Sequence, residues 1–352
     1  QLKKGSNMKI TRILVALSFL FAVSNVNAGE LSVTGNMETT YMSQNGTTNG
    51  NPLGMDRELK FSASTELDNG ISVSVMQDTS DAFAFGNSQI SFGNIMGLAT
   101  IYVGSDSDPI DGIDDITPSA YEEANGSGSG TYVDIGGAAG QLGIGLKVAL
   151  PFLGALNAKH YPKIDSTKNA DNNVSGDVGP TVGSAYSATL TTNMGDVDPM
   201  LDGLVITTGV GERERSTIKS AEKNFDATVA VNYAYGPVKV GVQRKHTSVG
   251  TIVANSLAND APSVRHNDLV LGAAYAVNDS LSISLNRYTS TRTNDTASTL
   301  ADSNGVQETD AISVGYTIGG MVVGFQSAST DNAGYVVGAE DSSNTLGLSV
   351  AF

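Results

Sequence analysis

Seven carboxylates crowd into one short segment and are the residues whose types and spacing most suggest chemistry. They are Asp106, Asp108, Asp111, Asp114, Asp115, Glu122 and Glu123. Oxygen donors suit Ca²⁺, but Ile110 occupies the third ligand position of a calcium loop and no Glu closes a twelve-residue frame. We therefore expect no cofactor and no resident metal. Adventitious Ca²⁺ and a merely solvated charge run stay open as alternatives.

Other chemical motifs are missing from the sequence. The chain has no G-x-S-x-G elbow, no G-x-x-x-x-G-K-[ST] phosphate loop and no H-E-x-x-H pair. Its histidines, His160, His246 and His266, are not spaced as metal ligands. The absence of cysteine excludes disulfides, thiolate metal sites and a Cys nucleophile. These observations predict that the protein is not an enzyme.

The first 28 residues are typical of a removable leader. After Met8 come a basic start, an apolar run from Ile13 to Val23 and a small-residue exit at Val26-Asn27-Ala28. The apolar run is too short for a membrane-spanning helix, which needs about 20 residues. We predict that residues 1–28 are upstream sequence plus a signal peptide cleaved after Ala28, and that residues 29–352 form the mature domain.

Charge excludes one class of partner. The chain of 352 residues has a formal net charge of −16, which becomes −20 when the leader's basic residues Lys3, Lys4, Lys9 and Arg12 are removed. A nucleic-acid binder needs a basic face to replace condensed counterions. A nucleic-acid partner is therefore not expected.

Period-two alternation dominates the remaining chain and predicts β-strands. Near the C-terminus, Leu346, Leu348 and Val350 alternate with small or polar residues up to Phe352. One face of each such strand is apolar and the other is small or polar. We predict sixteen strands, near residues 30–43, 55–67, 70–80, 86–93, 98–104, 130–137, 141–150, 181–193, 201–211, 223–235, 237–247, 267–277, 280–290, 308–318, 321–329 and 343–352.

Segments between these strands alternate in length. Tight turns are expected at 68–69, 94–97, 138–140, 236, 278–279 and 319–320, with 194–200 somewhat longer, whereas the other connections are long. Short turns at one end and long loops at the other are typical of an all-β, antiparallel transmembrane barrel with short periplasmic turns and long external loops. A secreted adhesin or lectin with a soluble β-core is the alternative from another class, and solubility without detergent would identify it.

Aromatic residues are concentrated near the expected strand ends, where amphipathic rings favour membrane interfaces. We predict an outward aromatic girdle in two rows. The row at the turn side contains Tyr233, Tyr235, Tyr275, Tyr316 and Phe352, and the row at the loop side contains Tyr41, Tyr102 and Tyr288.

Over the whole mature segment the sequence resembles sixteen-stranded general diffusion porins of the Gram-negative outer membrane, of the alphaproteobacterial type. The resemblance rests on the opening strand from Glu30, the hairpin that starts at Phe92 and feeds a long acidic loop, and the terminal Phe352. It implies a third external loop, about 105–129, that folds into the lumen. It also implies a homotrimer, assembly by the barrel-assembly machinery with Phe352 as the signal, and small hydrophilic solutes as cargo.

The expected function is a water-filled outer-membrane channel for passive diffusion of small hydrophilic solutes and ions. Its constriction would combine the seven loop carboxylates with cations that parity points inward. These cations are Lys60, Lys147, Lys239 and Lys245. Because the acids outnumber the lysines in the narrow zone, we expect a preference for cations. A substrate-selective channel with a dedicated binding site is the alternative, and saturable flux would identify it.

Three arginines are predicted to face lipid. Parity places Arg57, Arg244 and Arg287 outward near the external strand ends, where they could contact lipopolysaccharide phosphates. A β-bulge would reverse that parity and turn them into the pore mouth, which is an equally open alternative.

Overall fold

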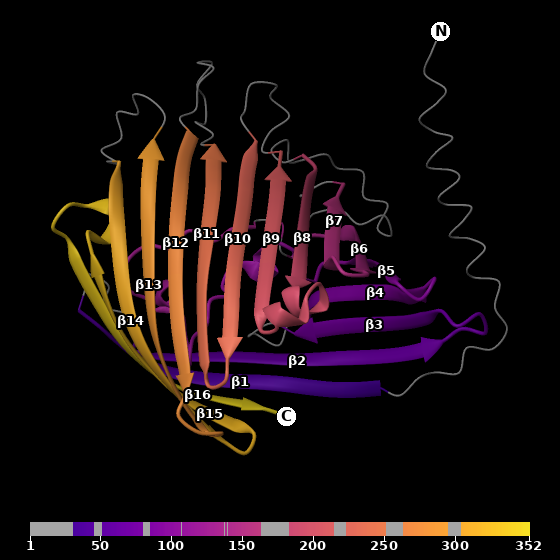
Figure 1. Ribbon diagram of the computed structural model, residues 1–352, viewed down its shortest axis with the longest axis horizontal. Coiled ribbons are helices and arrows are strands. Elements are labelled where there is room, and N and C mark those ends of the chain that lie inside the picture. Colours follow the sequence, from indigo (N-terminus) through magenta and orange to yellow (C-terminus); the bar gives the residue numbers. More distant parts are fainter. Residues whose placement is uncertain are drawn as a thin grey trace, which may run out of the picture.

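The computed structural model describes residues 31–45, 51–79, 85–106, 108–136, 138, 140–162, 183–214, 223–250, 263–294 and 304–352. Within them, sixteen antiparallel strands form one closed barrel in which each strand pairs with its neighbours in sequence and β1 pairs with β16 (Figure 1). The predicted leader and its cleavage site lie outside the described residues. No helix in the described part of the chain is long and apolar enough to cross a membrane.

Fifteen of the strands match predicted ones, and strand length varies from one side of the barrel to the other. They are β1 (Leu31–Gln44), β2 (Leu53–Glu66), β3 (Ser72–Thr79), β4 (Phe85–Ile95), β5 (Ala99–Gly104), β6 (Gly143–Leu150), β7 (Gly154–Tyr161), β8 (Ala185–Asn193), β9 (Leu204–Arg213), β10 (Asn224–Tyr235), β11 (Val238–Gly250), β12 (Ser263–Ala276), β13 (Leu281–Asn294), β14 (Gly305–Ile318), β15 (Met321–Asp331) and β16 (Glu340–Ala351). Short 3₁₀ turns, including Asp111–Ile113 and Ala124–Gly126, lie in the connections.

The barrel has a polar interior and an apolar exterior, the reverse of a soluble domain. Gln243, Gln307 and Gln326 are almost fully buried inside, whereas Leu285 and Val229 are exposed on the outer surface. Strand pairing satisfies the backbone donors and acceptors around the whole circumference, as hydrocarbon requires. A soluble sandwich, which would bury its apolar faces against each other, is therefore the wrong architecture for this chain.

The C-terminal residue completes the barrel. The backbone N–H of Gly35 donates to the carbonyl oxygen of Phe352 at 2.8 Å, and Phe352 donates back to Gly35 at 3.0 Å. The Phe352 ring lies over Gly35, where a Cβ would approach the ring to 2.4 Å. The terminal aromatic residue therefore joins the last strand to the first.

One predicted strand and one predicted turn are wrong. Residues 131–136 form no ladder, because Tyr132 and Ile135 pack against the inside of the barrel instead of lipid. The turn predicted at 138–140 lies at 151–153, and β7 occupies a segment that we expected to be loop. His160 takes an outward position on β7 and the aromatic Tyr161 an inward one, so the strand lacks a clean apolar face, which explains why alternation missed it.

The aromatic girdle is confirmed in part. Tyr41, Tyr233, Tyr235, Tyr275, Tyr316 and Phe352 are exposed on the outer surface. Tyr102 and Tyr288 are buried inside the barrel, so their predicted place in the outer row is wrong. Their strands carry them on the inward parity, beside Asn157 and Asp268, to which their hydroxyls donate at 2.8 and 3.0 Å.

Candidate functional site

The connection between β5 and β6, residues 105–142, lies inside the barrel, and we call it the inner loop. Amide side chains of the wall bind its backbone carbonyls. Gln243 of β11 donates to Ile113 at 2.7 Å, Asn286 of β13 to Pro118 at 3.1 Å and Gln326 of β15 to Glu122 at 2.8 Å. The loop is thus fixed to the inner surface over at least these strands.

Glycines on adjacent strands create the space that the inner loop occupies. A Cβ on Gly315 would lie 2.2 Å from the carbonyl oxygen of Ala120, and one on Gly347 would lie 2.0 Å from the Tyr121 hydroxyl oxygen. Gly241, Gly272 and Gly324 are equally close to residues 118–121. Side chains at these positions would push the loop toward the barrel axis, so the glycine track sets how far it stays from the opposite wall.

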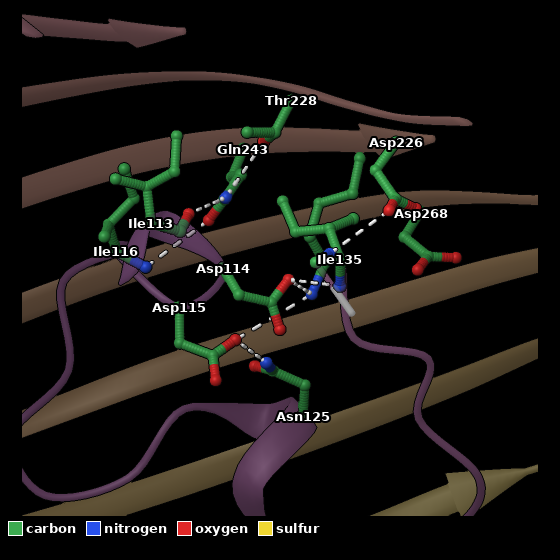
Figure 2. A network of polar contacts seen from close by, with 12 residues as sticks. Ile113, Asp114, Asp115, Ile116, Asn125, Ile135, Asp226, Thr228, Gln243 and Asp268 are labelled. Atoms are coloured by element: carbon green, nitrogen blue, oxygen red, sulfur yellow. Dashed lines mark hydrogen bonds and ion pairs between the residues drawn. The ribbon is translucent and has the colours of Figure 1, made fainter. Parts of the chain in front are cut away.

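A buried ion pair anchors the first half of the loop, and Figure 2 shows its acids, Asp114 and Asp115, with Ile135 and Asn125 beside them. Lys245 of β11 is 2% exposed, and its Nζ lies 2.9 Å from Asp114 and 3.8 Å from Asp115. The backbone N–H of Ile135 donates to the same Asp114 carboxylate at 3.2 Å, and Asn125 donates to Asp115. Burial raises the pKa of Asp114 to about 7 although Lys245 opposes the shift.

Acidic residues at the start of the loop also contact protein. Asp108 is buried and accepts from the Ser187 hydroxyl of β8 and from the N–H groups of Ile110 and Ala138. Lys159 of β7 donates to the backbone oxygen of Asp106 at 2.7 Å. Asp108 therefore ties two parts of the loop to the wall and is withdrawn from the lumen.

Glu122 and Glu123 come directly after residues 118–121, which pack against the glycine track, and their side chains differ in exposure. Glu122 is half-buried, and burial followed by repulsion from Glu38 and Asp115 raises its pKa to about 7. Glu123 is 6% exposed, and burial raises its pKa to about 8. Tyr121, beside them, donates to Glu38 of β1 at 2.6 Å. Near neutral pH these two carboxyls are thus close to their titration range.

The loop returns across the same wall. Gln307 of β14 donates to the backbone oxygen of Thr131 at 2.9 Å and accepts from its N–H at 3.0 Å. The Tyr132 ring packs edge-on against Tyr288 with centroids 5.1 Å apart. Residues 130–136, which belong to the predicted strand 130–137, therefore form the returning part of the inner loop.

Open space remains between the loop and the β1–β2 side of the wall. A recess of about 340 Å³ is lined by Glu38, Asp56 and Glu122, together with Met42 and Gly126. A second recess of about 220 Å³ is lined by Thr34, Gly35, Asn36, Glu58 and Lys60. Carboxylates from the wall and the loop thus share the first space, and one lysine enters the second.

The predicted constriction residues separate into two groups. Asp111, Asp115, Glu122, Lys60 and Lys147 retain exposed or half-exposed side chains on the inner side. Asp108, Asp114, Glu123 and Lys245 are buried between the loop and the wall, while Asp106 is half-buried beside Lys159. Lys147 lies over the Tyr102 ring at 5.3 Å, and Lys239 is the second residue of β11, far along the strand from Lys245.

Sequence reasoning missed Glu38, Asp56, Glu58 and Lys159. The first three lie on the same inward parity as Lys60, with Glu38 opposite Asp56 in the register, so parity alone could have found them. Lys159 was missed because its strand was missed. Repulsion from Asp108, Asp134 and Asp115 adds to burial in raising the pKa of Asp111, a sign of how acidic this interior is.

The register places all three predicted lipid-facing arginines on the outer parity. Arg57 pairs with Met37, Arg244 with Leu269 and Arg287 with Leu271. Arg287 forms a two-pronged contact with Asp310, at 2.7 and 2.6 Å, and an ion pair with Glu308 at 3.1 Å. Two carboxylates of β14 therefore already balance this guanidinium.

Within the described residues no group of three or more His, Cys, Asp or Glu side chains is arranged to hold a metal ion. The acids of the inner loop are spread along its length and several are held by backbone N–H groups or by Lys245. Their arrangement supplies an electrostatic surface with no pre-formed coordination shell.

Comparison with known proteins finds relatives in structure alone. No protein-family model and no curated protein matches the sequence. An anion-selective porin from Comamonas acidovorans has a TM-score of 0.64 at 12% identity, and the alignment covers 92% of this chain and 100% of that one. The outer membrane channel DcaP of Acinetobacter baumannii has a TM-score of 0.61 at 13% identity, covering 92% and 97%.

A third similar structure is the trimer form of OmpT, an outer membrane protein of Vibrio cholerae. Its TM-score is 0.58 at 10% identity, with 93% of this chain and 100% of that one covered. The predicted fold is thus confirmed: this chain has the sixteen-stranded barrel of the outer-membrane porins.

Proposed function

We propose that this protein is an outer-membrane porin, a water-filled channel for passive diffusion of small hydrophilic solutes and ions with a preference for cations. The observation that carries the proposal is the inner loop, which is hydrogen-bonded along one side of a closed barrel and faces open recesses on the other. A barrel of this size is too wide for strand side chains to fill, so water occupies its interior. The loop then determines the narrowest section.

The cation preference rests on the charges that remain accessible. Glu38, Asp56 and Glu122 line one recess, and Asp115 is exposed nearby on the loop. Lys245, the cation closest to the loop acids, is buried in its ion pair and contributes little field to the lumen. Carboxylates between low-dielectric walls attract counter-ions into a narrow passage. Because a similar structure is described as anion-selective, the side chains and not the fold must decide the sign.

The same proposal includes export and assembly. Cleavage after Ala28 would release the mature chain, and Phe352, which pairs with Gly35, would present the signal to the barrel-assembly machinery. The trimer form among the similar structures supports a homotrimer. The outward arginines Arg57, Arg244 and Arg287 would contact lipopolysaccharide, and the guanidinium of Arg287 is at the same time paired with Asp310 and Glu308. The proposal assigns no catalytic role to any residue and no bound cofactor.

A planar bilayer under a KCl gradient tests the proposal. We expect stepwise ohmic conductance and a reversal potential that indicates K⁺ preference. The triple variant Glu38→Gln, Asp56→Asn, Glu122→Gln should move that potential toward zero. A control that removes the same charge at the turns, Asp68→Asn, Asp196→Asn, Asp279→Asn, should leave it almost unchanged. Chloride preference in the unmodified protein would refute the assignment of sign, and absence of conductance would refute the channel.

A substrate-selective channel is the second candidate, since the recess between Glu38 and Glu122 is a defined space with Met42 and Tyr121 beside it. Flux of cationic solutes into liposomes distinguishes the two. A rate that stays linear with concentration supports general diffusion, whereas a rate that saturates supports a dedicated site.

A further inference from the structure

Three carboxylates from separate parts of the chain face one space inside the barrel. We call it the acid recess, the volume of about 340 Å³ lined by Glu38 of β1, Asp56 of β2 and Glu122 of the inner loop, together with Met42 and Thr345. Glu38 and Asp56 are directly opposite each other in the β1–β2 ladder, where like charges destabilise a sheet. Burial and then repulsion from Glu38 raise the pKa of Glu122 to about 7. The fold therefore holds these acids together at an electrostatic cost.

Neighbouring groups fix two of the carboxylates without neutralising them. The Tyr121 hydroxyl donates to Glu38 at 2.6 Å. The Glu122 carboxylate lies over Gly126, where a Cβ would approach its oxygen to 2.8 Å. Among the described residues, neither Glu38 nor Glu122 forms an ion pair with a lysine or an arginine. Within the described structure, the counter-charge for these two acids is left to the solution.

A buried hydroxyl on the same surface has no partner. Thr345 of β16 lines the acid recess and is 6% exposed, and its Oγ1 has no hydrogen-bond partner among the described residues. Burying a hydroxyl without a hydrogen bond is unfavourable, and such groups are rare in folded proteins. Met42, the register partner of Thr345 on β1, is a flexible side chain that can adapt to a ligand. The recess thus offers an unused hydrogen-bonding group in addition to its acids.

The make-up of the acid recess favours one kind of cation. Within the described part of the chain no three acids are arranged to hold a metal ion, so a compact divalent cation finds no coordination shell. A single ammonium group would neutralise one carboxylate and leave the others facing each other. Two ammonium groups on a hydrocarbon stem fit carboxylates on separate elements, with Met42 beside the stem. The volume is near the lower end of the ~300–1,000 Å³ that ligand sites span, which favours a small ligand.

We propose that the acid recess binds a small aliphatic diamine, with one ammonium group at Glu38 and Asp56 and the other at Glu122. The inference rests on the proposed function and names the solute class of its second candidate, the channel with a dedicated site. The diamine supplies counter-charge to the wall and to the inner loop at once, so its binding relieves the repulsion between Glu38 and Glu122. At saturating concentration it occupies the passage and reduces the K⁺ current.

Titration calorimetry of the detergent-solubilised protein measures binding without any ion flow. The probe is 1,4-diaminobutane, and the comparison cations are n-butylamine, which has the same stem and one charge, and Mg²⁺, which has two charges and no stem. We expect saturable heat for the diamine, with a dissociation constant at least tenfold below those of both comparison cations. Equal affinity for the diamine and Mg²⁺ would indicate attraction of charge alone and would overturn the proposal, as would the absence of saturable heat for the diamine.

Variants with a matched control locate the site. Glu38→Gln and Glu122→Gln should each raise the dissociation constant of the diamine at least tenfold, whereas Glu66→Gln, which removes a carboxylate at the turn end of β2, should change it less than twofold. Thr345→Val removes the partnerless hydroxyl at nearly constant volume and should weaken binding severalfold without lowering thermal stability. Equal effects of Glu66→Gln and Glu38→Gln would refute the assigned position, and unchanged binding in Thr345→Val would refute the role of the hydroxyl.

Single-channel recording separates this inference from the channel itself. In the wild type, 1,4-diaminobutane should reduce the K⁺ current with a saturating dependence on concentration, and Glu122→Gln should remove the block while it still conducts. An unblocked current in a protein that binds the diamine refutes the placement of the site in the passage. A protein that binds the diamine but does not conduct refutes the proposed function and leaves the site, whereas one that conducts but does not bind refutes the site alone.

Discussion

Replacing Lys245 by Met tests how the inner loop is held. Nζ of Lys245 lies 2.9 Å from Asp114 and 3.8 Å from Asp115, and the lysine and Asp114 side chains are 1% and 8% exposed. Without the ammonium group, the Asp114 carboxylate would be left charged in a buried position. Breaking a buried pair by removing one partner costs about 3–5 kcal/mol.

The free-energy cost of removing Lys245 depends on pH, and the burial of Asp114 determines whether it rises or falls with pH. Burial raises the pKa of Asp114 to about 7 even though Lys245 lowers it, so in Lys245→Met the pKa is higher still and the carboxyl takes up a proton readily below that raised pKa. Above it the charge remains and the loop loses about 3 kcal/mol of attachment, which is about a hundredfold in the docked-to-undocked ratio. Hydrogen bonds from Gln243, Asn286 and Gln326 still hold other parts of the loop. We therefore expect partial, transient release.

Single-channel recording provides the assay. Lys245→Met should show frequent current fluctuations at pH 8.5 and far fewer at pH 6, whereas the wild type is quiet at both. Adding Asp114→Asn should restore a quiet channel, because both charges of the buried pair are then absent. Lys239→Met, an inward lysine near the turn, is the control and should behave as wild type. Equal noise in Lys245→Met and Lys239→Met at pH 8.5 would refute the anchoring role of the ion pair.

Three further predictions concern charge, shape and closure. Burial raises the pKa values of Glu122 and Glu123 to about 7 and 8. The protonated carboxyls therefore favour the docked loop below the pKa of the unfolded chain, and this stabilisation is lost as the pH rises through the pKa of the folded protein. The reversal potential should therefore show stronger K⁺ preference at pH 9 than at pH 5.5, and a pH-independent potential would contradict this. Gly347→Ala should displace Tyr121 and change the single-channel conductance, since its Cβ would lie 2.0 Å from the hydroxyl oxygen, while Gly112→Ala, with nothing within 4 Å, should not. Deleting Phe352 should lower outer-membrane yield severalfold more than shortening the loop within 251–262, and Phe352→Tyr should retain the yield; immunoblots of membrane fractions measure both.

Alternation predicts the barrel because successive side chains of a pleated strand point to opposite faces. Moving a residue by one position therefore turns its side chain from the lipid to the lumen. Fifteen of the sixteen strands and nearly all of the turns follow from that rule, and so does the outward placement of Arg57, Arg244 and Arg287; the total of sixteen agrees because the false strand at 130–137 offsets the missed β7. The rule fails where an apolar residue is buried by protein inside the barrel. Tyr132 and Ile135 resemble strand residues because they pack on the inside of the wall, and β7 departs from the rule because His160 is on its outward face and Tyr161 on its inward face.

The sequence could not predict which loop carboxylates are buried and which face water, because this depends on the path of the inner loop over the wall. That path is determined by glycines on five strands that are distant along the chain, Gly241, Gly272, Gly315, Gly324 and Gly347. Only pairing in register aligns them into one track.

Selectivity in this barrel therefore depends on which charges the wall neutralises and which it leaves facing water. Asp114 and Lys245 cancel each other in a buried pair, and Asp108 is held by N–H and hydroxyl donors, so none of the three contributes strongly to the lumen. Glu38 and Asp56, which the acidic run does not include, face the open recess instead. A count of charges along the loop would assign the proposed cation preference to buried residues. Because Glu38 and Asp56 line the recess whereas Asp108 and Asp114 are buried, neutralising Glu38 and Asp56 should reduce the proposed selectivity more than neutralising Asp108 and Asp114.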